Sequence, residues 1–90
     1  MWEYDVPEPA RADFERVYGA DGDWARLFSA SEGFLGTELF ASASVPGRYL
    51  TVDRFTDEAA WHAFLAEHRE AYERLDAASE RLTESERELA

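Results

Sequence analysis

The sequence contains no cysteine and no lysine, and these absences narrow the structures and partners open to it. Without cysteine, neither a disulfide nor a thiolate metal site can stabilise the fold. A chain of 90 residues buries only a modest core, so we expect a second subunit to supply further burial. The sequence also has no long apolar run and no charged-then-apolar leader, so we expect a cytoplasmic protein that does not enter a membrane.

Positive charge is scarce. Nine basic residues, all of them arginine, stand against 20 acidic residues, and the formal net charge is -11. Nucleic acids and anionic lipid surfaces are bound through basic patches, and both are repelled by an acidic chain. We therefore expect neither a nucleic acid nor a membrane as a partner.

The middle of the chain changes from a strand pattern to a helix pattern. Residues 34–40 and 48–55 are rich in β-branched and aromatic residues with alternating polarity, which predicts two strands. After Thr56 or Asp57, either of which can cap a helix, the period lengthens and predicts one long amphipathic helix. Its apolar face consists of Trp61, Phe64, Leu65, His68, Tyr72 and Leu75.

The first third of the chain predicts a strand and a broken helix. Residues 2–6 alternate and are followed by prolines, which end a strand. The helical pattern that follows is interrupted by glycines at 19–22, which predicts two half-helices. The order strand, broken helix, strand, strand, helix is that of a ferredoxin-like split βαβ fold with an antiparallel sheet. We therefore expect an α+β fold, with one domain over residues 1–90.

The end of the chain shows no strand pattern, so we expect the last strand of this fold to be missing. Residues 76–90 read as a helical tail, and the Thr83–Glu86 segment matches a capping box that predicts a short helix over 83–89. An uncovered sheet edge invites pairing with another chain. The tail is therefore expected to fold back over part of that edge or to cross to the partner subunit, anchored by Leu82 and Leu89, and to be the least stable element.

The helices of this fold cover one face of the sheet, and strand alternation predicts which residues they cover. We expect the aliphatic set on the helix-facing side: Leu35, Leu39, Leu50 and Val52. The opposite face would then carry Phe34, Phe40, Tyr49 and Phe55, together with Glu38 and Asp53. An exposed aromatic face of this kind normally marks an interface or a ligand groove, which predicts a homodimer through this face.

Segments 18–28, 33–39, 48–55, 72–76 and 82–86 resemble small proteins of the antibiotic biosynthesis monooxygenase superfamily. The resemblance implies a dimeric α/β barrel, in which two ferredoxin-like chains pack their sheets together. It also implies either oxidation of a polycyclic phenol by dioxygen with no cofactor, or cleavage of haem. The expected ligand is a small aromatic or polyketide-like molecule.

The monooxygenase hypothesis needs a base and a group that stabilises an anion. The candidate bases are His68, which titrates near neutrality, and Asp53, whose pKa would rise in a cavity. The candidate stabilising groups are Arg54 and Tyr72. The competing interpretation for His68 is a packed structural role, and for Asp53 it is an ion pair with an arginine. His62 and His68 lie on different faces of the helix, which argues against a metal site.

The candidates for binding a ligand are aromatic side chains and a second carboxylate. Trp24 and Trp61 could stack on a planar ligand, and Tyr49 could donate a hydrogen bond to it. Glu38 could accept one. The structural alternatives are core packing for Trp61 and a cross-strand ion pair for Glu38.

A second hypothesis is a dimeric module without catalysis, which binds a small hydrophobic ligand or a protein partner. In the better-understood relatives, a polar group set around an asparagine helps to activate the substrate. This chain has no asparagine, and it shows no close set of acid, base and nucleophile. A haem-binding variant with His68 as axial ligand is a third alternative.

Overall fold

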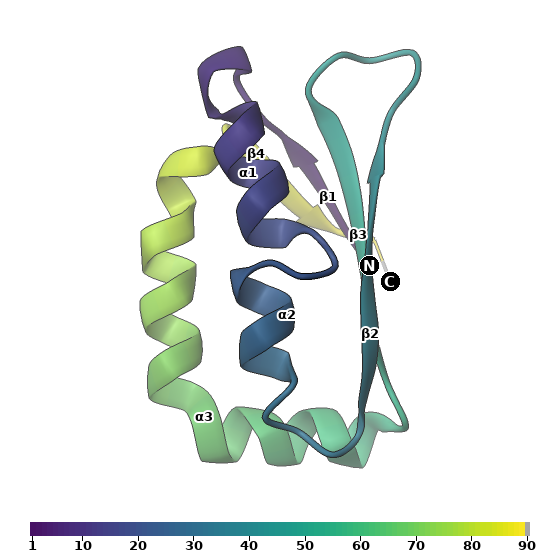
Figure 1. Cartoon of the computed structure of the whole chain (residues 1–90), viewed down its shortest axis with the longest axis vertical. Helices are drawn as coiled ribbons and strands as arrows, with labels where there is room; N and C mark the ends of the chain where they lie inside the picture. Colours follow the sequence, from purple (N-terminus) through teal and green to yellow (C-terminus); the bar gives the residue numbers. More distant parts are fainter. Residues whose placement is uncertain (90) are drawn as a thin grey trace.

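The computed structural model describes residues 1–89 and shows an antiparallel sheet covered on one face by helices (Figure 1). The elements are β1 (Trp2–Asp5), η1 (Glu8–Ala10), α1 (Arg11–Tyr18), α2 (Asp23–Phe28), β2 (Phe34–Ala41), β3 (Arg48–Phe55), α3 (Glu58–Ser79), η2 (Glu80–Leu82) and β4 (Ser85–Glu88). The four strands lie in the order β2-β3-β1-β4. This order is that of the split βαβ pattern, so the predicted ferredoxin-like α+β fold is confirmed.

The predicted break in the first helix separates α1 from α2. Gly22 lies at this break, where a Cβ atom would come within 2.4 Å of the Arg16 carbonyl oxygen and 2.5 Å of that of Val17. Only glycine permits so close an approach between backbone segments. The break lets α2 start in a new direction, which places Trp24 and Phe28 in the core beneath α3.

Helix α3 begins at a predicted cap and bends in its middle. Asp57 accepts a hydrogen bond from the Ala60 backbone N–H at 2.8 Å. His68 has φ -122° and ψ 24°, which interrupts the helix, and Figure 1 shows α3 running in two different directions on either side. Trp61 lies before the bend and Tyr72 after it. Both halves of α3 therefore contribute to the same core.

The expectations of a missing last strand and a helical tail are wrong. Helix α3 ends at Ser79, and β4 pairs antiparallel with β1. Ser85 donates a hydrogen bond to Asp5 at 2.9 Å, and Arg87 forms an ion pair with Glu3. The free backbone groups of β1 provide these four residues with partners, and this pairing outweighs the helical propensity of their sequence. The sheet edge is thus covered by a strand of the chain itself.

The assignment of the two sheet faces is also wrong for β3. Tyr49 and Thr51 are buried, and Asp53 lies with them on the helix-facing side. The aliphatic residues Leu50 and Val52 alternate with them and face the other side. Alternation therefore divides the residues of β3 into the two expected sets, but the set with the aromatic residues, and not the aliphatic set, faces the helices.

A bulge in β2 further changes which residues share a face. The pairing of β2 with β3 shifts between Phe34 and Gly36, which places Phe34 over the core beside Phe55. Leu35 is 65% exposed and Phe40 is 48% exposed, so both lie on the open face. Of the aliphatic residues of β2, only Leu39 packs against the core as expected.

The two leucines expected to anchor the tail differ sharply in burial. Leu82 is 1% exposed, whereas Leu89 is 49% exposed. Ala90, the last residue of the expected tail, lies outside the described residues. Leu82 therefore connects α3 to the core just before β4 begins.

We expect Leu82→Ala to lower the free energy of unfolding by about 2–5 kcal/mol, because it leaves a cavity in the core. Leu89→Ala is the matched control and should change that free energy by no more than about 0.5 kcal/mol. Urea unfolding followed by circular dichroism measures both values. Equal effects of the two substitutions would show that the turn into β4 is not anchored in the core.

Candidate functional site

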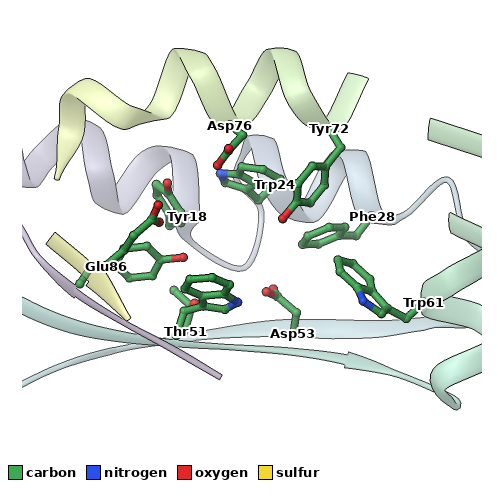
Figure 2. A pocket seen from close by; sticks show the side chains of 11 residues that line it. Tyr18, Trp24, Phe28, Thr51, Asp53, Trp61, Tyr72, Asp76 and Glu86 are labelled. Atoms are coloured by element: carbon green, nitrogen blue, oxygen red, sulfur yellow. The ribbon is translucent and has the colours of Figure 1, made fainter. Parts of the chain in front are cut away.

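A cavity of about 170 Å³ lies between the helices and the sheet (Figure 2). Its lining residues come from every strand except β2, and from all three α-helices. They are Trp2, Tyr4, Tyr18, Trp24, Phe28, Thr51, Asp53, Trp61, Tyr72, Asp76 and Glu86. All three tryptophans of the chain are among them. The cavity is therefore a space that the aromatic side chains of the core surround but do not fill.

Asp53 rises from the sheet into this cavity (Figure 2). Thr37 on the neighbouring strand donates its hydroxyl hydrogen to Asp53 Oδ1 at 2.7 Å. The residue is partly buried, and loss of water around the carboxylate raises the pKa of Asp53, an effect that the Thr37 hydrogen bond and the terminal amino group oppose. A carboxyl group of this kind takes up a proton at higher pH than an exposed aspartate.

Aromatic rings enclose the cavity on the helix side. Trp24 and Tyr72 meet edge to face with their centroids 5.1 Å apart, and Trp61 and Tyr72 do so at 6.2 Å. Phe28 contacts Trp61 at 5.9 Å. These contacts hold the rings in fixed orientations, which provides an apolar wall for a planar ligand.

Two buried polar atoms of the lining have no hydrogen-bond partner: Trp24 Nε1 and Thr51 Oγ1. The Tyr18 hydroxyl lies near Trp24 Nε1 and the Tyr4 hydroxyl lies near Thr51 Oγ1, but neither contact has the geometry of a hydrogen bond. An unpaired buried polar group costs free energy, and native proteins contain few of them. A bound molecule with polar atoms could supply the missing partners.

Negative charge accumulates around the cavity. Burial and the nearby carboxylates of Asp76 and Glu80 raise the pKa of Glu86. The pKa of the Tyr72 hydroxyl is raised by burial and then by the carboxylates of Asp76, Glu86, Asp53 and Glu88. Burial also raises the pKa of Tyr18 to about 12. All three tyrosines of the lining therefore remain neutral donors at physiological pH.

An outer groove of about 380 Å³ lies next to the cavity and shares Trp2, Asp53 and Trp61 with it. The other lining residues of the outer groove are Met1, Phe55, Asp57, Glu58 and Glu88. Asp53 therefore stands where the cavity and the outer groove meet.

A family model described as Antibiotic biosynthesis monooxygenase matches residues 1–74. The chain belongs to this family. The match covers β1 to β3 and most of α3, and with them every cavity residue except Asp76 and Glu86. A search of curated proteins found no match. Among residues 1–89, no helix is both long enough and apolar enough to cross a membrane.

The structure brings together four of the residues singled out from the sequence. Asp53, Tyr72, Trp24 and Trp61 all line the cavity. They come from β3, α2 and both halves of α3. These elements are far apart in the sequence, so folding is what brings the four residues together. Within residues 1–89, no group of three or more metal-binding side chains is positioned to hold a metal ion.

The other candidates lie elsewhere. Glu38 and Asp53, expected on one face, lie on opposite faces, and Glu38 accepts a hydrogen bond from Arg54 Nε at 2.8 Å on the open face. Tyr49 is buried away from the cavity and donates its hydroxyl hydrogen to Glu15. His68 lies at the bend of α3 against a phenylalanine ring, and lines neither the cavity nor the outer groove.

Sequence reasoning missed the other lining residues, which are Trp2, Tyr4, Tyr18, Phe28, Thr51, Asp76 and Glu86. Thr51 could have been found, because it is two positions before Asp53 on the same strand and therefore shares its face. Glu86 could not, since its position depends on a strand that the sequence did not indicate. Predicting Trp2 and Asp76 would have required the correct assignment of the helix-facing side of the sheet.

We expect Asp53→Asn to stabilise the protein at pH 7 and to have no effect below the pKa of an unfolded aspartate, about 3.9. Because the folded pKa of Asp53 is raised, its ionisation costs stability as pH rises above the unfolded pKa, and the full cost is present above the folded pKa. Asparagine remains neutral and can still accept the Thr37 hydrogen bond. Urea unfolding at a series of pH values measures the difference.

Asp21→Asn is the matched control, because Asp21 is exposed in the loop between α1 and α2. It removes the same charge and should change the free energy of unfolding by no more than about 0.5 kcal/mol. A difference between Asp53→Asn and the wild type that does not vary with pH would contradict the account.

Proposed function

We propose that the protein is a cofactor-independent monooxygenase that acts on a small aromatic molecule of polyketide type. The observation that carries this proposal is the position of Asp53, a partly desolvated carboxylate facing a cavity with aromatic walls and unpartnered polar atoms. A base with a raised pKa is suited to accept a proton near neutral pH. Membership of the monooxygenase family supports the reaction class.

In the proposed reaction, Asp53 accepts a proton from a ring CH₂ group next to a carbonyl, or from its phenol tautomer. The Trp24 indole N–H and the Tyr72 hydroxyl donate hydrogen bonds to the oxygen that becomes negative. Arg54, considered for this role from the sequence, is on the far face of the sheet. The electron-rich carbon then reacts with dioxygen. One oxygen atom forms the new carbonyl group, and the other leaves as water with the two hydrogen atoms.

The dimensions of the site limit how a substrate fits. A cavity of roughly 150 Å³ accommodates a single benzene ring, so the 170 Å³ cavity holds about one ring. A substrate with two or three fused rings would extend past Asp53 into the outer groove. Its reactive carbon would then lie at the junction, beside the carboxylate.

The alternative function is a binding module without turnover. It is favoured by the absence of asparagine from the sequence, because in the better-understood relatives a polar group set around an asparagine helps to activate the substrate. Such a module would use the same aromatic walls. Turnover, rather than binding, distinguishes the two functions.

An oxygen electrode with anthrone and related phenols as substrates tests the proposal. We expect oxygen uptake that falls about 10²–10⁴-fold in Asp53→Asn, because the base is lost. His68→Gln should leave the rate unchanged, since His68 does not line the cavity. Uptake no faster than in buffer across the substrate panel would exclude the monooxygenase, and a loss confined to His68→Gln would identify the other base.

We further propose a homodimer formed through the open face of the sheet. Phe40 is exposed there opposite the half-buried Leu50, and Val52 lies two residues further along β3, which makes an apolar area facing away from the helices. The exposed Leu35 lies beyond the Glu38–Arg54 ion pair on the same face. The interface thus uses mainly the aliphatic residues, rather than the aromatic set expected from the sequence.

Sedimentation equilibrium tests the dimer. Phe40→Glu should yield a monomer, because it places a charge in the proposed interface. Val45→Glu is the control, since Val45 is 40% exposed in the turn beyond the sheet, and it should remain dimeric. A wild-type chain that is monomeric at micromolar concentration would overturn the proposal.

A further inference from the structure

We propose that the cavity binds an organic cation, namely a protonated amine attached to an oxygen-bearing aromatic ring. The proposal concerns binding, and it holds whether or not the protein turns a substrate over. It combines three features of the lining: its carboxylates, its aromatic walls and its two unpartnered polar atoms.

The charge of the lining favours a cation. Asp53, Asp76 and Glu86 line the cavity, and Asp57, Glu58 and Glu88 line the outer groove. No arginine or histidine side chain of the described residues lines either space. The positive group nearby is the α-amino group of Met1 at the outer groove, which acts on Asp53. An anionic ligand would be repelled here, and a neutral one would leave the carboxylates uncompensated.

The aromatic walls bind a cation by a second mechanism. The face of an indole or phenol ring attracts an ammonium group within about 6 Å of its centroid, and more strongly where water is excluded. At the cavity, the Tyr72 ring contacts Trp24 at 5.1 Å and Trp61 at 6.2 Å. Figure 2 shows Asp53 across the cavity from Trp24 and Tyr72 and beside Trp61, so a cation in this space would lie near the rings and a carboxylate together.

The unpartnered atoms specify the rest of the ligand. Thr51 is 2% exposed, and its Oγ1 atom can accept a hydrogen bond from an ammonium N–H. Trp24 is 7% exposed, and its Nε1–H can only donate, so it requires an acceptor such as a phenol or carbonyl oxygen. One aromatic ring with an ammonium group and an oxygen provides both partners. Its size agrees with a cavity that holds about one ring.

Three probes of nearly equal shape separate charge from shape: 3-hydroxybenzylamine, 3-hydroxybenzyl alcohol and 3-hydroxybenzoate. Isothermal titration calorimetry measures their affinities, and the indole N–H signals of the tryptophans in NMR spectra report occupancy of the cavity, because every tryptophan lines it. We expect the amine to bind about 10-fold or more tightly than the alcohol, and the benzoate to show no binding. Equal affinities for the three probes would overturn the proposal.

Variants test where the amine binds. Asp76→Asn and Asp53→Asn should each weaken binding of the amine about 10-fold while changing that of the alcohol little. Asp21→Asn removes the same charge from an exposed loop and should leave both affinities unchanged. An equal loss in Asp21→Asn would show that only the net charge of the protein attracts the amine, and would overturn the proposal. Unchanged indole signals in the free variants establish that they fold normally.

The experiments can contradict the amine-binding proposal and the monooxygenase proposal independently of each other. Selective binding of the amine without oxygen uptake would support the inference and exclude the monooxygenase. Oxygen uptake with neutral phenols, together with no preference for the amine, would do the reverse.

Discussion

The alternation of side chains along β3 is the constraint on which the rest of the site depends. Successive residues of a strand face opposite sides, so burial of Tyr49, Thr51 and Phe55 beneath the helices brings Asp53 to the same side. A carboxylate in this position loses part of its hydration, and among residues 1–89 only the Thr37 hydroxyl donates a hydrogen bond to it. The fold thus carries a destabilising group at the centre of its sheet, which is typical of a functional position.

The elements around Asp53 form a cavity because two of them depart from regular structure. The bend at His68 turns α3 so that Trp61 and Tyr72 face the same space from different directions. The break at Gly22 redirects the chain so that Trp24 packs against Tyr72. Strand β4 adds the acidic residues Glu86, which lines the cavity, and Glu88, which lines the outer groove. Negative charge and aromatic surface consequently lie together, which determines the chemistry that the site can bind.

The sequence predicted the element order well, because periodicity and glycine positions report local structure directly. It failed where long-range contacts decide. Ser85 and its neighbours have helical propensity, and only pairing with β1 makes them a strand. The faces of β2 could not be assigned by counting, since the bulge at Leu35 shifts the alternation by one residue. Asp53 and Tyr72 were identified as candidates by residue type, but their meeting in one cavity depends on tertiary structure.

Titration of the Asp53 carboxyl carbon by NMR spectroscopy tests the central claim most directly, because it measures the desolvation of the group around which the site is built. The account predicts a pKa above the usual value of about 3.9 for aspartate, and a fall in that pKa when 3-hydroxybenzylamine binds. A pKa at or below the usual value, unchanged by the amine, would contradict the account. It would show that Asp53 is hydrated or paired, and that the cavity is not its environment.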